Sequence, residues 1–100
     1  IDLGAEMIAA QKGTKKIAVE IKSFLNVSAV DDFEDALGQF ILYHFALVKK
    51  EPDRVLFLAV PNEFYHSFFD DSFFIELIEH YQVKMIIFDE LNANIELWKM

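Results

Sequence analysis

The stretch KKIAVEIKSFL, residues 15–25, decides the fold that we expect, because it has the composition of a strand in the middle of a sheet. Its apolar residues are too numerous for a strand that keeps one face in water. Glu20 and Lys22 nevertheless stand inside this run. Burying a charged side chain is unfavourable unless the charge is paired or holds a ligand. The pattern therefore indicates either a structural ion pair or a functional site.

Length and composition limit what can surround this strand. The chain has 100 residues, 54% of them hydrophobic and 15% aromatic, which suffices for the core of one domain. We therefore expect residues 1–100 to form a single domain. The sequence has no cysteine, no signal-peptide pattern and no apolar run of the roughly 18 residues that a bilayer span needs. These features predict a soluble protein of the cytoplasm.

The charge balance limits how the chain can meet nucleic acid. Its formal net charge is −8, whereas DNA binding usually relies on Lys and Arg side chains that replace condensed counterions. Any contact with DNA is therefore expected to be local, metal-assisted or made through a partner. The chain also starts at Ile1, inside an apparent strand and without a methionine, so we expect it to be part of a longer product.

The first half of the chain predicts a hairpin followed by a long helix. Residues 1–9 alternate apolar and polar with the period of a strand, and the polar residues 11–16, with a glycine among them, indicate a turn before the second strand. Residues 28–50 have helical spacing. Ser28 is the expected N-cap, acidic residues follow it and two lysines close the segment, as the helix dipole favours.

The second half predicts the rest of an α/β or α+β sandwich. Residues 55–61 form a short apolar run that ends in a proline, as in a central strand. Residues 62–82 indicate two short aromatic helices divided near Asp70 and Asp71. A buried strand over 83–89 and a final edge strand complete the order β-β-α-β-α-(α)-β-β. This order predicts a mixed central sheet flanked by helices.

The charged residues of the hairpin form a candidate site. Strand alternation puts Glu20 and Lys22 on one face. A hairpin centred near Lys12 would place Gly4 opposite Glu20 and Asp2 opposite Lys22. Asp2 and Glu20 would then be diagonal neighbours, with roughly 7 to 8 Å between their backbones. One metal ion could bridge two carboxylates at that distance.

Two carboxylates and an ammonium group suit metal-assisted hydrolysis of a phosphodiester. Hard carboxylate oxygens hold Mg²⁺ through few protein ligands and leave it several waters, one of which can act as the nucleophile. A nearby lysine can orient that water or stabilise charge that develops on the phosphate. The alternative is an ion-pair cluster that only neutralises itself inside the sheet, because a Glu-x-Lys pattern is short and common.

The order of these residues resembles a known nuclease core. Asp2, then Glu20-Ile21-Lys22 leading into a helix, resembles the PD-(D/E)XK pattern. The wider sequence IDLGAE, AAQKGTKKIAVEIKSFL, DFEDALGQFILY and EPDRVLFLAVP resembles the XisH family, named for the fdxN element excision controlling factor of cyanobacteria, and does so along all 100 residues. The family resemblance implies a restriction-endonuclease-like fold and a role in programmed excision of a DNA element beside an XisI-like partner.

The same resemblance implies roles for individual residues. Asp2 and Glu20 match the acids that bind Mg²⁺ or Mn²⁺, and Lys22 matches the catalytic lysine. Gln39 matches the glutamine that related nucleases often carry on the helix after the motif. Two features depart from the pattern, because the helix that precedes the first acid is absent and Ile1 stands where the motif has a proline. A controlling factor also need not cut DNA, since fold and activity separate easily. The alternative function is a non-catalytic module that binds an XisI-like protein or a recombinase.

The remaining features leave two interpretations each. Gln39 and Tyr43 share a helical face and could reach a metal-bound water or a phosphate, or only hydrogen-bond to the sheet. The phenylalanine-rich residues 63–81 could be a second core layer, or could leave apolar surface for a protein partner or a homo-oligomer. The acidic residues 31–35 are expected to be a solvated helix start. The three histidines show no ligand spacing, which argues against zinc.

Overall fold

The computed structural model describes residues 7–12, 15–21 and 28–99. Its elements follow the predicted order, including the division of the aromatic segment into two short helices. Their bounds are β1 Met7–Lys12, β2 Lys15–Ile21, α1 Ala29–Lys50, β3 Arg54–Pro61, α2 Asn62–Phe68, α3 Ser72–His80, β4 Met85–Asp89 and β5 Asn94–Lys99. None of the helices in these ranges combines the length and the apolar character that crossing a bilayer requires.

The five strands form one mixed sheet in the order β1-β2-β3-β4-β5. The two outer pairs, β1 with β2 and β4 with β5, are antiparallel, while β2, β3 and β4 are mutually parallel. Strand β3 lies in the middle, and five consecutive residues of it are buried. The apolar run that ends at Pro61 is thus a central strand, as its sequence predicts.

The hairpin is present, but its predicted register is wrong by three residues. Met7, and not Gly4, pairs with Glu20, and the last pair joins Lys12 to Lys15. Only residues 13–14 lie between the strands, so the polar residues expected in a turn extend both strands. The physical reason is that polar side chains are tolerated at the end of an antiparallel pair, and a two-residue link containing glycine suffices to close a hairpin.

Helix α1 begins and ends where the sequence predicts. The Ser28 side chain accepts a hydrogen bond from the backbone N–H of Asp31 at 3.2 Å, and Lys49 and Lys50 stand in the last turn. The apolar residues of the helix divide between two faces. Phe33 and Phe40 are buried against the sheet, whereas five others are exposed: Val30, Ile41, Leu42, Phe45 and Val48. A helical apolar pattern therefore does not identify a single buried face here.

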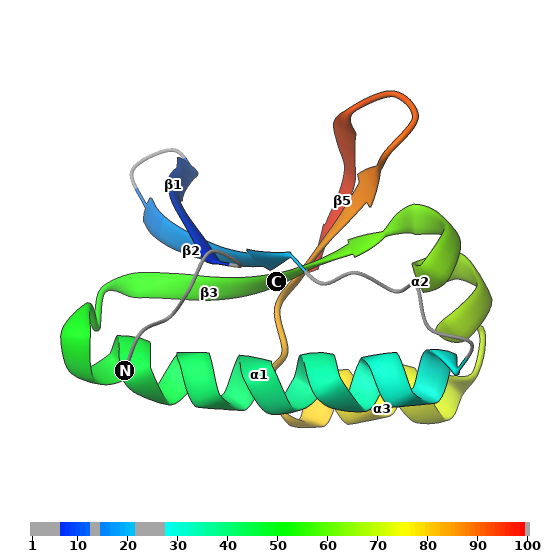
Figure 1. Ribbon diagram of the computed structural model, residues 1–100, viewed down its shortest axis with the longest axis horizontal. Helices are drawn as coiled ribbons and strands as arrows, with labels where there is room; N and C mark the ends of the chain where they lie inside the picture. Colours follow the sequence, from blue (N-terminus) through cyan, green and yellow to red (C-terminus); the bar gives the residue numbers. More distant parts are fainter. Residues whose placement is uncertain (1–6, 13–14, 22–27, 100) are drawn as a thin grey trace.

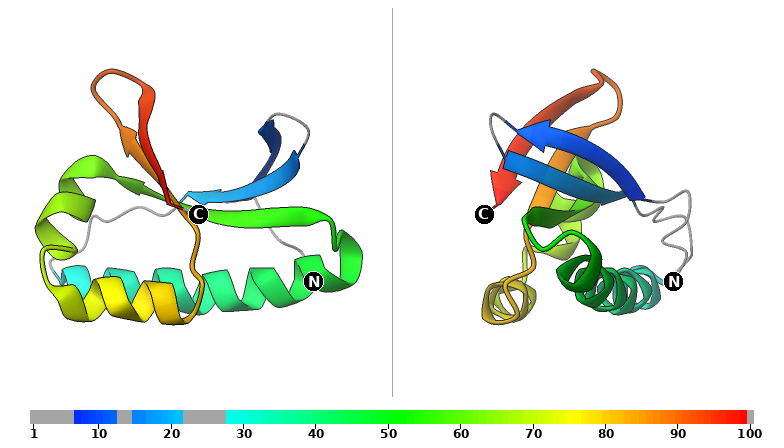
Figure 2. Two further views of the ribbon diagram at one scale, coloured as in Figure 1. Left: turned by 180° about the vertical axis from the view of Figure 1, so that it is seen from behind. Right: turned by 90° about the vertical axis from the view of Figure 1, so that its left-hand side faces the viewer.

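The three helices of the described residues lie on the same face of the sheet, as Figures 1 and 2 show. The main core joins all three helices to one set of alternating strand residues, among them Ala18, Leu56 and Leu58. The other face has a smaller core built only of strand residues, in which Trp98 meets the ring of Phe57 edge-on at 5.2 Å. The outer hairpins rise on this second side (Figure 1), so the twisted sheet partly covers itself.

Most of the aromatic segment belongs to the core. Phe33 of α1 lies 5.2 to 5.8 Å from the rings of Phe68, Phe69 and Phe74, in tilted or edge-on contacts. Phe33 is 3% exposed, whereas Phe73 is 61% exposed. The second-layer interpretation therefore holds for most of these rings, and Phe73 is an exposed exception.

Replacing Phe33 by alanine is expected to destabilise the fold by about 3 to 5 kcal/mol, because it removes a buried ring and leaves a cavity among three others. Urea unfolding followed by circular dichroism would measure the change. Phe73→Ala is the matched control, and its exposed ring should change stability by less than about 0.5 kcal/mol. Equal losses in the two variants would contradict this account of the core.

Candidate functional site

The backbone of Glu20 lies near the carboxyl end of β2, in register with Leu58 of β3 and Met7 of β1. Ala18, two residues earlier on the same strand, is buried in the core that packs on α1. Because residues of a strand alternate between faces, position 20 is on the α1 side of the sheet. The carboxyl ends of parallel strands are where α/β folds commonly bind ligands.

The two flanks of α1, on either side of its buried face, lie under different halves of the sheet, and one of them faces β2. His44, on the opposite flank, lines a cleft of about 340 Å³ together with Tyr81, which follows α3. Since α3 lies on the β4 side of α1 (Figure 2), the other flank faces the half of the sheet that holds β2. Three polar residues share that flank at positions i, i+7 and i+11. They are Asp32, Gln39 and Tyr43.

Gln39 has an unsatisfied buried atom on this flank. Its side chain is half-buried, and its Oε1 is the one buried side-chain oxygen or nitrogen without a hydrogen-bond partner in the described part of the chain. Leaving such a group unpaired costs about 1 to 3 kcal/mol, so folded proteins rarely keep one without a reason. An acceptor held beside β2 can receive a hydrogen bond from water or a ligand. Tyr43, one turn later, does have an interaction partner.

Asp32 corrects the expectation that the whole acidic start of the helix is solvated. It is 1% exposed and is the only buried charged residue within the described ranges, whereas Asp31, Glu34 and Asp35 are exposed. The helix turns residue 32 toward the sheet, on the same flank as Gln39. Asp32 does have an interaction partner, as a buried carboxylate requires. The sequence signal was its seven-residue spacing from Gln39.

The structure locates the predicted site only in part. Asp2 and Lys22 lie outside the described residues, and for Glu20 only the backbone is described. The corrected register separates Glu20 from Gly4, so the proposed pairing of Gly4 with Glu20 no longer supports the diagonal placement of Asp2. Within residues 7–12, 15–21 and 28–99, no three histidine, aspartate or glutamate residues are grouped as metal ligands.

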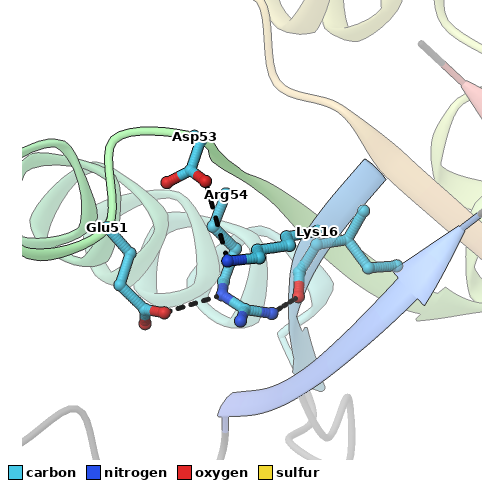
Figure 3. A network of polar contacts seen from close by, with 5 residues as sticks. Lys16, Glu51, Asp53 and Arg54 are labelled. Atoms are coloured by element: carbon cyan, nitrogen blue, oxygen red, sulfur yellow. Dashed lines mark hydrogen bonds and ion pairs between the residues drawn. The ribbon is translucent and has the colours of Figure 1, made fainter. Parts of the chain in front are cut away.

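A separate polar network ties the opposite ends of the parallel strands together (Figure 3). Arg54, at the start of β3, donates from Nε to Glu51 at 3.2 Å and from Nη1 to the carbonyl of Ile17 at 2.7 Å. Its side chain is 14% exposed. Lys16 and Asp53 form an exposed pair at 3.8 Å beside it. This network joins α1, β2 and β3 at the end away from Glu20, and its role is structural.

A second polar cluster joins α2 to the edge strand β5. The Glu96 carboxylate accepts a hydrogen bond from Asn62 Nδ2 at 2.9 Å and contacts His66 Nε2 at 2.8 Å. These contacts, that with His66 foremost, hold the pKa of Glu96 below its ordinary value. Beyond β4, Asn92 donates to Asp89 and likewise lowers the pKa of that carboxyl. Neither feature was predicted: the Glu96 cluster depends on which distant residues the sheet brings together, whereas the Asp89 contact is local to the turn after β4.

Comparison with known proteins identifies the family. The model of the XisH protein family matches residues 1–96 of this chain. The chain belongs to the XisH family. The resemblance expected from the sequence is confirmed, and the match extends from β1 into the first half of β5. Among curated proteins, no significant match was found.

Two crystal structures of XisH relatives agree with the fold. An XisH family protein from Nostoc punctiforme is 48% identical, with a TM-score of 0.88. An fdxN element excision controlling factor protein from Anabaena variabilis is 50% identical, also with a TM-score of 0.88. Each match covers 94% of this chain and 74% of the relative. At this similarity the relatives share the arrangement of the sheet and of α1.

Gln39→Met is expected to raise the free energy of unfolding by about 1 to 2 kcal/mol, because it replaces an unpaired buried oxygen by an apolar group of similar size. Urea unfolding would measure the change. Glu76→Met, at an exposed position of α3 with equal helix propensity, is the control and should be nearly neutral. A loss of stability in Gln39→Met would show that the amide oxygen is satisfied in the protein.

His66→Ala is expected to raise the pKa of Glu96 toward its ordinary value, because it removes the main contact that stabilises the carboxylate. Because the pKa of Glu96 is lower in the folded state than in the unfolded chain, the contact stabilises the fold at pH values above the ordinary carboxyl pKa. This stabilisation disappears as the pH falls through the pKa of the folded state. NMR titration of the Glu96 carboxyl would measure the shift. His44→Ala, on α1, should leave it unchanged, and an unmoved Glu96 pKa in His66→Ala would refute the assignment.

Proposed function

We propose that this chain acts as an accessory factor in the excision of a DNA element and carries a PD-(D/E)XK-type site on a restriction-endonuclease-like fold. Two findings support the biological role: membership of the XisH family, and the 50% identical relative described as an fdxN element excision controlling factor. The arrangement β2-α1-β3, with a helix between parallel strands and an acidic residue near the end of β2, supports the fold assignment.

The unpaired Gln39 oxygen is the observation that carries the catalytic part of the proposal. Sequence resemblance assigns a functional glutamine to this position of the helix, and the structure independently leaves its amide oxygen buried and unsatisfied. The flank that holds it faces the half of the sheet where Glu20 lies. A polar group kept at a cost in stability beside a candidate site is typical of functional positions. It fits an acceptor for a water or a substrate hydroxyl.

The residues of the site have complementary roles in this proposal. Asp2 and Glu20 would hold Mg²⁺ or Mn²⁺, because carboxylates are the ligands that these ions prefer. When bound, such an ion supplies an acidified water and neutralises charge on the phosphate. Lys22 would orient the attacking water by donating a hydrogen bond, and Gln39 would accept one from it. The buried Asp32 adds a further carboxyl group to the same flank.

A non-catalytic interaction module is the second candidate function. The net charge of −8 favours it, because an acidic chain repels DNA unless a partner supplies positive surface. In this alternative the Glu20 and Lys22 cluster is a structural ion pair, and the work of the chain is to bind an XisI-like protein or a recombinase. A self-neutralised pair has no free metal ligands, so metal binding separates the two functions.

Glu20→Gln is expected to weaken Mg²⁺ or Mn²⁺ binding at least about tenfold, because it removes one of two charged ligands. Isothermal titration of both ions into the wild-type and variant chains would measure this, and nicking assays on linear and branched DNA would follow. Glu79→Gln, an exposed acid on α3, controls for the lost charge. If the wild-type chain binds neither ion, the catalytic proposal is eliminated and the interaction module remains.

A further inference from the structure

The outward face of α1 is apolar at its centre. Ile41 and Phe45 are both 59% exposed and Leu42 is 48% exposed, although the buried core of the helix lies on the opposite side. Glu34 and Gly38 precede them on this face and Lys49 follows, all exposed. We call these six residues the outer stripe of α1. Exposed apolar side chains gathered on one helix face are typical of a contact surface.

The spacing of the outer stripe is symmetric. From Glu34 to Lys49 the intervals are four, three, one, three and four residues. A two-fold axis between residues 41 and 42 therefore maps the stripe onto itself when two copies of α1 pack antiparallel. Under this operation Ile41 meets Leu42 of a second copy. Such a self-complementary patch is what a two-fold interface between identical chains requires.

No packing contact in the described part of the chain requires a glycine at position 38. A Cβ added there would meet no atom within 4 Å, and glycine within a helix costs roughly 0.5 to 1 kcal/mol relative to alanine. The two-fold axis places Gly38 opposite Phe45 of the second copy. A glycine allows the close approach that an opposing aromatic ring needs, so the large and small residues are complementary across the axis.

The ends of the stripe are complementary in charge. The same axis places Glu34 of each copy opposite Lys49 of the other, so that the helix pair would contain two such charge pairs. Lys49 already lies over the Phe45 ring, with its Nζ 4.8 Å from the ring centroid. Its ammonium group is thus positioned beside the apolar centre, where an opposing carboxylate can reach it. Parallel packing of two α1 helices would instead bring like charges together.

We propose that this face of α1 binds a second copy of the chain, forming an antiparallel two-fold helix pair centred between Ile41 and Leu42. Three features specify the occupant: the symmetric spacing, and, about the axis that this spacing defines, a glycine opposite a phenylalanine and opposite charges at the ends. The interface lies away from the β2 flank that holds Gln39. Dimerisation therefore leaves the candidate site accessible, and its test does not depend on metal binding.

Reversing the charges at the two ends of the outer stripe tests whether the chain binds a second copy of itself. Sedimentation equilibrium over a series of protein concentrations should show a monomer–dimer equilibrium for the wild type. Glu34→Lys and Lys49→Glu should each weaken the dimer about tenfold, because each places like charges opposite one another twice. The double variant Glu34→Lys with Lys49→Glu should restore dimerisation. A monomer at all concentrations, or a double variant no tighter than the singles, would overturn the proposal.

Gly38→Leu separates the interface from folding. Leucine favours the helix, and a Cβ at this position meets no atom of the described residues within 4 Å, so unfolding by urea should show equal or higher stability. The dimer should nevertheless be lost, because the new side chain occupies the position of the opposing Phe45. Leu91→Glu, at an apolar residue that is 91% exposed in the β4–β5 turn, should leave dimerisation unchanged. A dimer that survives Gly38→Leu would exclude this packing.

Discussion

The parallel pairing of β2 with β3 determines how the other elements are arranged. Two parallel neighbours cannot be joined by a tight turn, so the chain must cross from one end of the sheet to the other. Helix α1 makes that crossing with 22 residues. The crossing places the helix beneath β2 and β3. At the amino-terminal ends of these strands, Arg54 of β3 binds Glu51, which follows α1, and the backbone of Ile17 in β2. The opposite ends of these strands, near Glu20, hold the candidate site.

The crossover gives α1 three faces with different roles. One face supplies Phe33 and Phe40 to the core. The β2 flank carries Asp32 and Gln39, whose buried polar atoms belong to the candidate site. The outer stripe presents apolar residues to solvent. A single helix can serve all three roles because its 3.6-residue period separates neighbouring positions by about 100°.

Two residues of α1 carry local costs that packing does not explain. The unpaired oxygen of Gln39 and the unsupported glycine at position 38 are adjacent in sequence but point to different sides of the helix. Each is expected to lower the stability of the isolated chain, and each is a position for which we propose a contact outside it: a ligand for Gln39 and a second copy for Gly38. Departures from local consistency are where function is expected in a folded protein.

The element order, the caps of α1, the central position of β3 and the XisH family could all be predicted from the amino-acid sequence. They follow from short-range signals: periodicity, a capping serine, turn residues and a shared sequence pattern. The hairpin register, the burial of Asp32 and the clustering of Glu96 with Asn62 and His66 became known from the folded structure alone. These depend on contacts between distant residues, and a periodic pattern does not state which of two apolar helix faces meets the sheet.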